Sequence, residues 1–211
     1  MSSPPLFPLF VKLAGRPCIV VGAGGIAEQK IQSLVVCGAQ VSVVAPQATA
    51  GILELAARGA VTWRQKSFAA EDLNGFFLSV AATSSEDVNH EVFEESSQRG
   101  ILCNVVDDPP YCDFFYPAIV RRGHFQIAIS TGGHSPALAQ RIRKDLEQQF
   151  PPIYADWLET LGQERAALFS EVSDPELRRT LIKQSVDADS FARFAQHRVP
   201  ALGQAEGKDS Q

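Results

Sequence analysis

The chain has 211 residues, of which 45% are hydrophobic and 20% charged, and its formal net charge is −5. These values are ordinary for one moderate globular domain or two small ones. The acidic balance argues against a protein that coats nucleic acid. No apolar run approaches the ~20 residues of a membrane span, and the N-terminus lacks the basic and apolar regions of a signal peptide. We therefore expect a cytoplasmic protein with no nucleic-acid or membrane partner.

The first half of the chain alternates strand-like and helix-like segments. Short apolar runs predict strands, and the segments between them that end at a glycine predict helices. The expected strands are 17–21, 40–44, 60–65, 76–82 and 101–106. The expected helices are 25–37, 48–58 and 85–99. This alternation predicts an α/β fold with a Rossmann-like, doubly wound parallel sheet.

The pattern changes after residue 113. Residues 114–121 and 125–130 are strand-like runs with no helix between them, so they predict an antiparallel hairpin. Ser135 can cap a helix that begins at Pro136 and ends at Phe150. This helix shows Leu138, Ile142 and Leu146 on one apolar stripe. A later helix begins at Asp174-Pro175 and is expected to turn Leu177 and Leu181 inward.

The cysteines and two isolated histidines carry little chemistry by themselves. Cys18, Cys37, Cys103 and Cys112 form no CxxC pair, so we expect buried or half-buried free thiols and no zinc site. His90 and His197 are interpreted as surface residues. No metal-ligand cluster is expected.

The first predicted strand runs directly into a glycine-rich turn, Gly22-Ala23-Gly24-Gly25-Ile26-Ala27. This is the G-x-G-x-x-A form of the dinucleotide fingerprint, in which the first glycine makes a tight turn and the second lets a pyrophosphate approach the backbone. The following helix would direct free N–H groups at the phosphates. The alternative is a tight turn in an α/β fold that binds no nucleotide.

Three further strand ends should border the cofactor. The second strand ends in Ala45-Pro46 without the acidic residue that usually binds a ribose, so this point does not separate NAD from NADP. Thr83 follows the fourth strand among small residues that permit close approach of a ligand or simply pack strand against helix. Asn104 lies in the fifth strand, where a bound nicotinamide is expected.

Two carboxylates follow the fifth strand, Asp107 and Asp108. A dehydrogenase needs a group that accepts a proton while hydride leaves for the cofactor, and Asp107 is the candidate. The alternative is that either aspartate only begins a turn before Pro109.

Three blocks, CNVVDDP, FFYPAIVRRG and IAISTGGHSPALAQRIR, resemble the core signature of the precorrin-2 dehydrogenase/sirohydrochlorin ferrochelatase family. The opening VGAGGIAEQK is similar to that family's glycine loop, although Gln29 stands where an Arg is more usual. The resemblance covers residues 7–147, and the remaining residues match only in being helical. The methyltransferase domain fused to some members is not in this sequence, which suggests the stand-alone form.

The resemblance implies NAD-dependent oxidation of precorrin-2 to sirohydrochlorin in siroheme biosynthesis. Some members also insert Fe²⁺, a step that does not require a tight preformed metal site. The family's key aspartate falls on Asp107, and its glycine-loop contacts fall on Gly22, Gly24, Gly25 and Ile26. A serine that is phosphorylated in some members falls on Thr131.

The resemblance also implies a domain order and a homodimer. The expected parts are an NAD-binding Rossmann domain at 1–113, a dimerisation segment at 114–150 and a small helical domain at 151–203. Residues 204–211 are small and polar and are expected to be a disordered tail.

A tetrapyrrole that bears many carboxylates needs cationic or N–H donors. The densest basic stretch and the glycine-rich loop before Pro136 are the candidates, although exposed arginines often only solvate a helix face. The predicted substrate-binding residues are Arg121, Ser130, Thr131, Gly132, Gly133, His134, Ser135 and Arg141. Two other functions remain open: an oxidoreductase acting on another anionic small molecule, and a non-enzymatic NAD(H)-sensing module.

Overall fold

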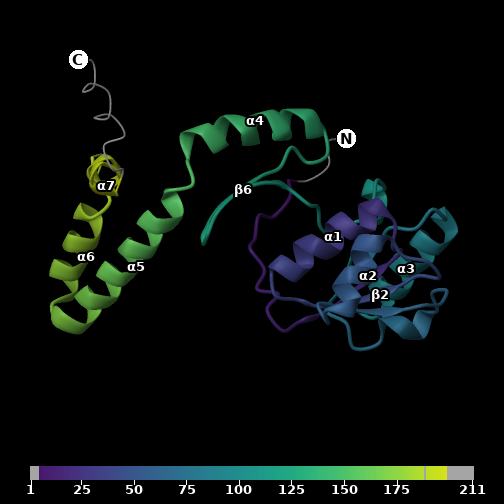
Figure 1. Cartoon of the computed structure of the whole chain (residues 1–211). Helices are drawn as coiled ribbons and strands as arrows, with labels where there is room; N and C mark the ends of the chain where they lie inside the picture. Colours follow the sequence, from purple (N-terminus) through teal and green to yellow (C-terminus); the bar gives the residue numbers. More distant parts are fainter. Residues whose placement is uncertain (1–4, 188, 199–211) are drawn as a thin grey trace, which may run out of the picture. The chain divides into compact units, whose positions relative to one another are not determined.

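The computed structural model describes residues 5–187 and 189–198 of the chain (Figure 1). They divide into two compact units, one ending at Tyr116 and the other beginning at Pro117. The finer division at residues 113, 150 and 203 stays a prediction. The tail predicted at 204–211 lies outside the described residues.

A five-stranded parallel sheet forms the centre of the first unit, with strand order β3-β2-β1-β4-β5. The strands are β1 (Pro17–Val21), β2 (Gln40–Val44), β3 (Val61–Arg64), β4 (Leu78–Ala81) and β5 (Leu102–Val105). The helices are α1 (Gly25–Val36), α2 (Ala50–Ala57) and α3 (Glu86–Gln98), with 3₁₀ turns η1 (Ala70–Leu73) and η2 (Pro109–Tyr111). The predicted doubly wound parallel sheet is confirmed.

The two faces of this sheet bury different helices. Cys18 and Val20 of β1 belong to a core cluster with the apolar residues of α1 and α2, which lie together in Figure 1. Ile19 and Val21 point to the other face and belong to a cluster that includes Val92 of α3. This alternation follows from the two-residue period of a strand. Full burial of each valine or isoleucine side chain contributes roughly 1.5–3 kcal/mol.

The strand order reverses between β1 and β4. The chain moves from β1 outward through β2 to β3 and then returns to β4 on the other side of β1. In doubly wound sheets, ligands bind beyond the carboxyl ends of the strands at such a reversal. The ends of β1 and β4 therefore border the expected cofactor crevice.

The second unit consists of a hairpin followed by helices. The antiparallel strands are β6 (Ala118–Arg122) and β7 (Phe125–Ile129), and the helices are α4 (Pro136–Gln149), α5 (Tyr154–Glu171), α6 (Pro175–Gln184) and α7 (Ser190–Arg198). Arg122 donates from Nε to the Phe150 carbonyl at 2.8 Å and from Nη2 to the Glu147 carbonyl at 3.2 Å, which ties the hairpin to the end of α4. The predicted hairpin, the cap at Ser135 and the helix start at Asp174-Pro175 are confirmed.

Several sequence expectations are wrong in detail. The strand predicted from residue 114 begins at Ala118, because Pro117 has no N–H to offer a strand partner. Leu177 is 48% exposed and does not face inward, and Leu138 of the predicted apolar stripe is 45% exposed. Cys37 caps the end of α1 and is exposed, whereas Cys18 and Cys103 are buried as expected. The His197 side chain lies outside the described residues.

In the described part of the chain, no helix combines the length and the apolar character needed to cross a membrane.

Candidate functional site

The turn after β1 requires glycine at its first position. Gly22 has φ 108°, and a Cβ placed there would lie 2.3 Å from the carbonyl oxygen of Ala82. The contact is with backbone, so no side chain can move aside. Gly22 thus allows the ends of β1 and β4 to approach each other at the strand reversal.

The next glycines leave the beginning of α1 open. Gly24 is the N-cap residue and provides no side-chain cap, so no side chain covers the N–H groups of the first turn. A Cβ on Gly24 or Gly25 would meet nothing within 4 Å, and Ile26 is 52% exposed. Open space beside unprotected N–H donors at a helix N-terminus fits the pyrophosphate of a dinucleotide.

The end of β2 presents backbone rather than charge. Ala45 is buried, and its carbonyl accepts from Trp63 Nε1 at 3.1 Å. Pro46 is exposed, and its carbonyl accepts from Gln65 Nε2 at 3.3 Å. Their contact with a cofactor stays a prediction.

A side chain of α3 holds the end of β4. Asn89 is buried, and its Oδ1 accepts from the Thr83 amide at 3.0 Å and from the Thr83 hydroxyl at 2.8 Å. Its Nδ2 donates to the Thr83 carbonyl at 3.2 Å. Thr83 is therefore fixed at the carboxyl edge, in the position expected for a residue beside a cofactor.

Asn104 has a structural task at the end of β5. Its side chain is buried and donates to the carbonyl of Phe114 at 2.8 Å and to Cys112 Sγ at 3.2 Å. These bonds hold the returning chain against β5. A contact between Asn104 and a nicotinamide stays a prediction.

Asp107 has an unusual backbone. Its φ is 61°, the one positive value at a non-glycine residue in the described ranges. Such conformations cost of order 1–3 kcal/mol and cluster at functional sites. The side chain is exposed and makes no hydrogen bond to another described residue. Its carboxylate is therefore available to a ligand.

Lys30 of α1 is a charged group near Asp107 that the sequence reasoning missed. Its Nζ lies 3.9 Å from the centre of the Tyr116 ring. Burial lowers the pKa of Lys30, and the negative charge of Asp107 opposes that shift. The sequence signal was present, since Lys30 lies in the VGAGGIAEQK block eight residues after Gly22.

His90 was interpreted as a surface residue, and that interpretation is wrong. Its side chain is 24% exposed, and Nε2 lies 2.7 Å from Oδ2 of Asp108. Its ring stacks on Tyr111 with centroids 3.8 Å apart. Glu86, His90 and Asp108 each offer one ligand atom, and these three atoms lie within 4.8 Å of one another. Such a group could hold a metal ion, and the sequence analysis did not predict it. Glu86 is 81% exposed, so this corner is open to solvent.

The predicted substrate loop belongs to the second unit. Gly132 and Gly133 have φ values of 59° and 81°, and this backbone turns the chain into α4. His134 Nδ1 lies 3.1 Å from the Thr131 carbonyl, and Ser135 accepts from the Leu138 amide at 3.3 Å. The loop also includes Ser130, whose hydroxyl accepts from the Gly132 amide at 3.1 Å. The loop is exposed for most of its length.

The two predicted arginines differ in setting. Arg121 is half-buried within β6, and its Nε atom is buried. Arg141 is 78% exposed and lies 3.8 Å from Asp145, one turn further along α4. Such an exposed pair is worth little, so the Arg141 guanidinium is available to an anion.

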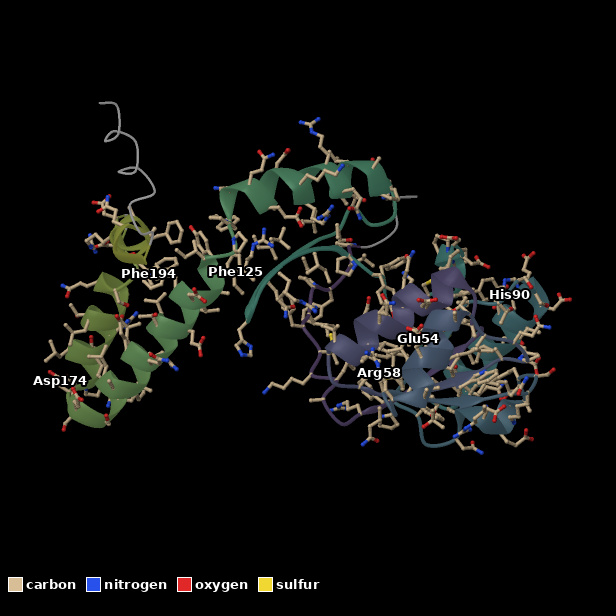
Figure 2. All side chains as sticks on the ribbon, in the orientation of Figure 1. Glu54, Arg58, His90, Phe125, Asp174 and Phe194 are labelled. Carbon is tan, nitrogen blue, oxygen red and sulfur yellow. The ribbon has the colours of Figure 1, made fainter. Side chains whose placement is uncertain are left out.

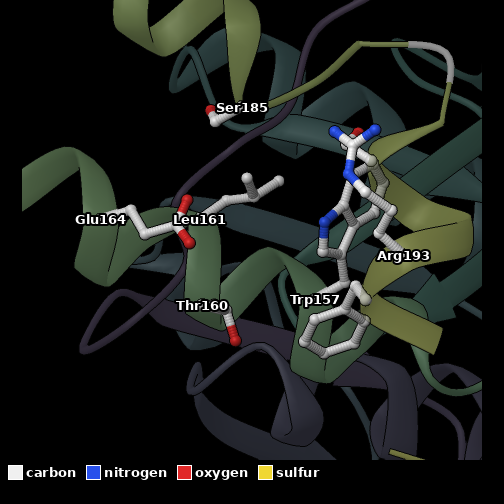
Figure 3. Close-up of a pocket in the computed structure, with 8 residues that line it drawn as sticks. Trp157, Thr160, Leu161, Glu164, Ser185 and Arg193 are labelled. Atoms are coloured by element: carbon white, nitrogen blue, oxygen red, sulfur yellow. The ribbon is translucent and has the colours of Figure 1, made fainter. Parts of the chain in front are cut away.

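A pocket of about 350 Å³ opens between helices of the second unit. Figure 3 shows Trp157, Leu161 and Arg193 around it. None of the predicted site residues lines it. We therefore assign it no part in the candidate site.

Comparison with known proteins places this site in a family. The model of the family described as "Putative NAD(P)-binding" matches residues 9–118, which include the glycine turn and the ends of all five parallel strands. The chain belongs to this NAD(P)-binding family. A second model, described as "Sirohaem biosynthesis protein central", matches residues 122–149. The resemblance drawn from the sequence is confirmed at the level of the family.

The similar proteins agree with this placement. The chain is 38% identical over 202 residues to a siroheme synthase of Neisseria meningitidis, covering 95% of this chain and 42% of the relative. It is 38% identical over 192 residues to a siroheme synthase of Methylococcus capsulatus, covering 91% and 40%. It therefore spans about two fifths of the length of these curated relatives.

One solved structure resembles most of the chain. It is SirC, a precorrin-2 dehydrogenase, with a TM-score of 0.78 and 28% identity. The match covers 91% of this chain and 98% of that one. The likeness thus extends beyond the parallel sheet into the second unit.

Proposed function

We propose that this chain oxidises precorrin-2 to sirohydrochlorin with NAD⁺. The observation that carries the proposal is Asp107, an exposed carboxylate on a strained backbone at the carboxyl edge of a sheet whose glycine turn is open to a dinucleotide. The likeness to SirC, a precorrin-2 dehydrogenase, supports the choice of substrate. The choice of NAD⁺ over NADP⁺ rests on the family resemblance, because the end of β2 carries no charge that selects between them.

In the first unit, different residues bind the cofactor and accept the proton. The N–H groups at the start of α1 bind the pyrophosphate, and Gly24 and Gly25 leave room for it. The bound nicotinamide supplies an acceptor for a hydride from the substrate. Asp107 accepts the proton released with it, so the substrate loses two electrons and two hydrogens in all. Lys30 provides a positive charge near Asp107.

The loop of residues 130–135 is proposed to bind substrate carboxylates. Its amides precede a helix N-terminus, where anions are stabilised. Arg121, Arg141 and His134 are proposed as further donors to these carboxylates.

Insertion of Fe²⁺ into sirohydrochlorin is a second candidate activity. The observation that favours it is the same exposed carboxylate, because metal insertion releases two pyrrole protons that a base must accept. The similar proteins are siroheme synthases, which agrees with this activity. Iron would be a substrate here.

We also propose that the chain forms a homodimer and that it is located in the cytoplasm. Ile119 of β6 and Leu138 of α4 are exposed apolar residues of the segment that the resemblance assigns to dimerisation. Light scattering at micromolar concentration would give the mass of two chains, and a monomer would contradict this part of the proposal.

The function is tested by an anaerobic assay in which precorrin-2 and NAD⁺ are added and the absorption spectrum of sirohydrochlorin is followed. Formation of sirohydrochlorin by the wild type, and its loss in Asp107→Ala, would support the proposal. NAD(H) binding without turnover would favour a sensing module. Turnover of a different anionic substrate would favour the other oxidoreductase.

A further inference from the structure

Two neighbouring side chains of α3 hold the two loops that border the candidate site. Asn89 makes three hydrogen bonds with Thr83 after β4. His90 contacts the Asp108 carboxylate after β5, with Nε2 and Oδ2 2.7 Å apart. Because β4 and β5 are parallel neighbours, the beginning of α3 lies beside the carboxyl ends of both.

The His90 ring has a defined orientation. It stacks on Tyr111 with an interplanar angle of 12°, and Tyr111 packs edge-on against Phe93 of α3 at 5.3 Å. The exposed fractions of the His90 and Asp108 side chains are 24% and 27%. A half-buried hydrogen bond between a ring and a carboxylate is stronger than one between exposed chains. His90 (labelled in Figure 2) therefore fixes Asp108 with a side chain that does not swing freely.

The side chain of Asp107 has no support of its own. Its carboxylate has no hydrogen bond to a described residue, so its position follows from its backbone. That backbone is in a left-handed conformation, and the amide of Asp108 bonds to the Val105 carbonyl over a long 3.4 Å. The Asp108 carbonyl accepts from Tyr111 N at 3.0 Å and Cys112 Sγ at 3.3 Å, both from within the same loop. The hydrogen bond to His90 connects the Asp108 carboxylate to α3.

We propose that His90 is a positioning residue, which holds Asp107 in its reactive conformation by binding the carboxylate of Asp108. The pair acts through the backbone and does not touch the substrate. This inference rests on the proposed function, in which Asp107 is the proton acceptor. A small displacement of a reacting group is enough to slow a step by one to two orders of magnitude, so about a tenfold loss is expected when the tie is cut.

Three variants separate this role from others. His90→Phe keeps a ring to stack on Tyr111 and removes the bond to Asp108. His90→Gln places an N–H donor close to the position of Nε2 and should restore most of the function. Glu86→Gln is the matched control, since this exposed neighbour lies 4.0 Å from His90 Nε2 and does not hold the loop.

The test measures kcat and KM of the full chain for precorrin-2 and NAD⁺. For His90→Phe we expect kcat to fall about tenfold while KM for NAD⁺ and the unfolding temperature change little, because only the reactive geometry is lost. His90→Gln should retain most of the wild-type kcat, and Glu86→Gln should be unchanged. A His90→Phe enzyme with wild-type kcat would overturn the proposal. So would equal losses in His90→Phe and Glu86→Gln, which would indicate that the three side chains act as a cation site.

A second readout does not require turnover. Amide hydrogen exchange in a peptide that covers residues 106–112 should be faster in His90→Phe, while a peptide around Thr83 stays unchanged because Asn89 still holds it. Unchanged exchange in both peptides would overturn the positioning role. If wild-type chain forms no sirohydrochlorin, the proposed function has failed, and this exchange result still decides whether His90 holds the loop.

Discussion

Substitution by alanine should have different effects at two glycines of the same turn. Gly22 has φ 108°, and an added Cβ would lie 2.3 Å and 2.6 Å from the carbonyl oxygen and carbon of Ala82. Gly24 has φ −83° and nothing within 4 Å of an added Cβ. Alanine at position 22 should therefore damage the fold, and alanine at position 24 should damage only the binding of a ligand that fills the open space.

The size of the first effect follows from two costs. Forcing a methyl group against fixed backbone costs about 1–3 kcal/mol, and holding alanine at a positive φ costs about 1–2 kcal/mol more. Gly22→Ala should thus lower the free energy of unfolding by about 3 kcal/mol. In a chain of this length that corresponds to a fall of about 10 °C in the unfolding temperature. Gly24→Ala should unfold within about 2 °C of the wild type.

The assay pairs thermal unfolding with NADH binding followed by fluorescence. Gly24→Ala should bind NADH at least about tenfold more weakly, since its methyl group occupies the space proposed for the pyrophosphate. A Gly22→Ala variant as stable as the wild type would refute the claim that the close approach of β1 and β4 requires glycine at this position. A stable Gly24→Ala variant with wild-type affinity for NADH would refute the placement of the cofactor at this turn.

Three further changes probe groups around the site. Asp107→Gly should leave the free energy of unfolding unchanged or raise it by up to about 1 kcal/mol, because glycine accepts φ 61° but is more flexible when unfolded. The variant should lose dehydrogenase activity. A large loss of stability in urea would contradict the strain assigned to Asp107. Tyr116→Phe should stabilise the chain by about 1 kcal/mol, because the buried Tyr116 hydroxyl has no hydrogen-bond partner among the described residues; destabilisation in urea would show that it has one. Burial raises the pKa of the Cys18 and Cys103 thiols from 9.0 to about 11. In the folded protein at mildly alkaline pH, iodoacetamide should therefore modify exposed Cys37 first, as mass spectrometry can follow. Since unfolded thiols ionise at lower pH than these two, the free energy of unfolding should fall as pH rises from 9.0 to about 11, and a flat profile would contradict their burial.

Local patterns were sufficient for the architecture. The run QVSVV predicts β2 at its observed limits, because a buried parallel strand is a short and nearly continuous apolar run. The G-x-G-x-x-A turn predicts both the end of β1 and the start of α1, since its backbone requirements are local. Errors arose where tertiary packing decides. Leu177 has helical spacing, yet α6 turns it to solvent.

The candidate site was predicted only in part, because some of its residues follow local patterns and others are brought together by tertiary packing. Asp107 could be found because it follows a strand whose carboxyl end must lie at the ligand edge. The charge of Lys30 near Asp107 and the contact of His90 with Asp108 join segments far apart in the chain, and no periodicity reveals such proximity. A usable signal existed for His90, since it lies early in the helix after β4 and therefore near the end of β5.

Dehydrogenase activity can be measured by mixing the purified chain anaerobically with precorrin-2 and NAD⁺ and recording the spectra of NADH and sirohydrochlorin together. We expect the two products to appear in equal amounts with wild-type chain and neither to form with Asp107→Ala. A wild-type chain that binds NAD⁺ yet forms neither product, or an Asp107→Ala variant that forms both at the wild-type rate, would contradict this expectation.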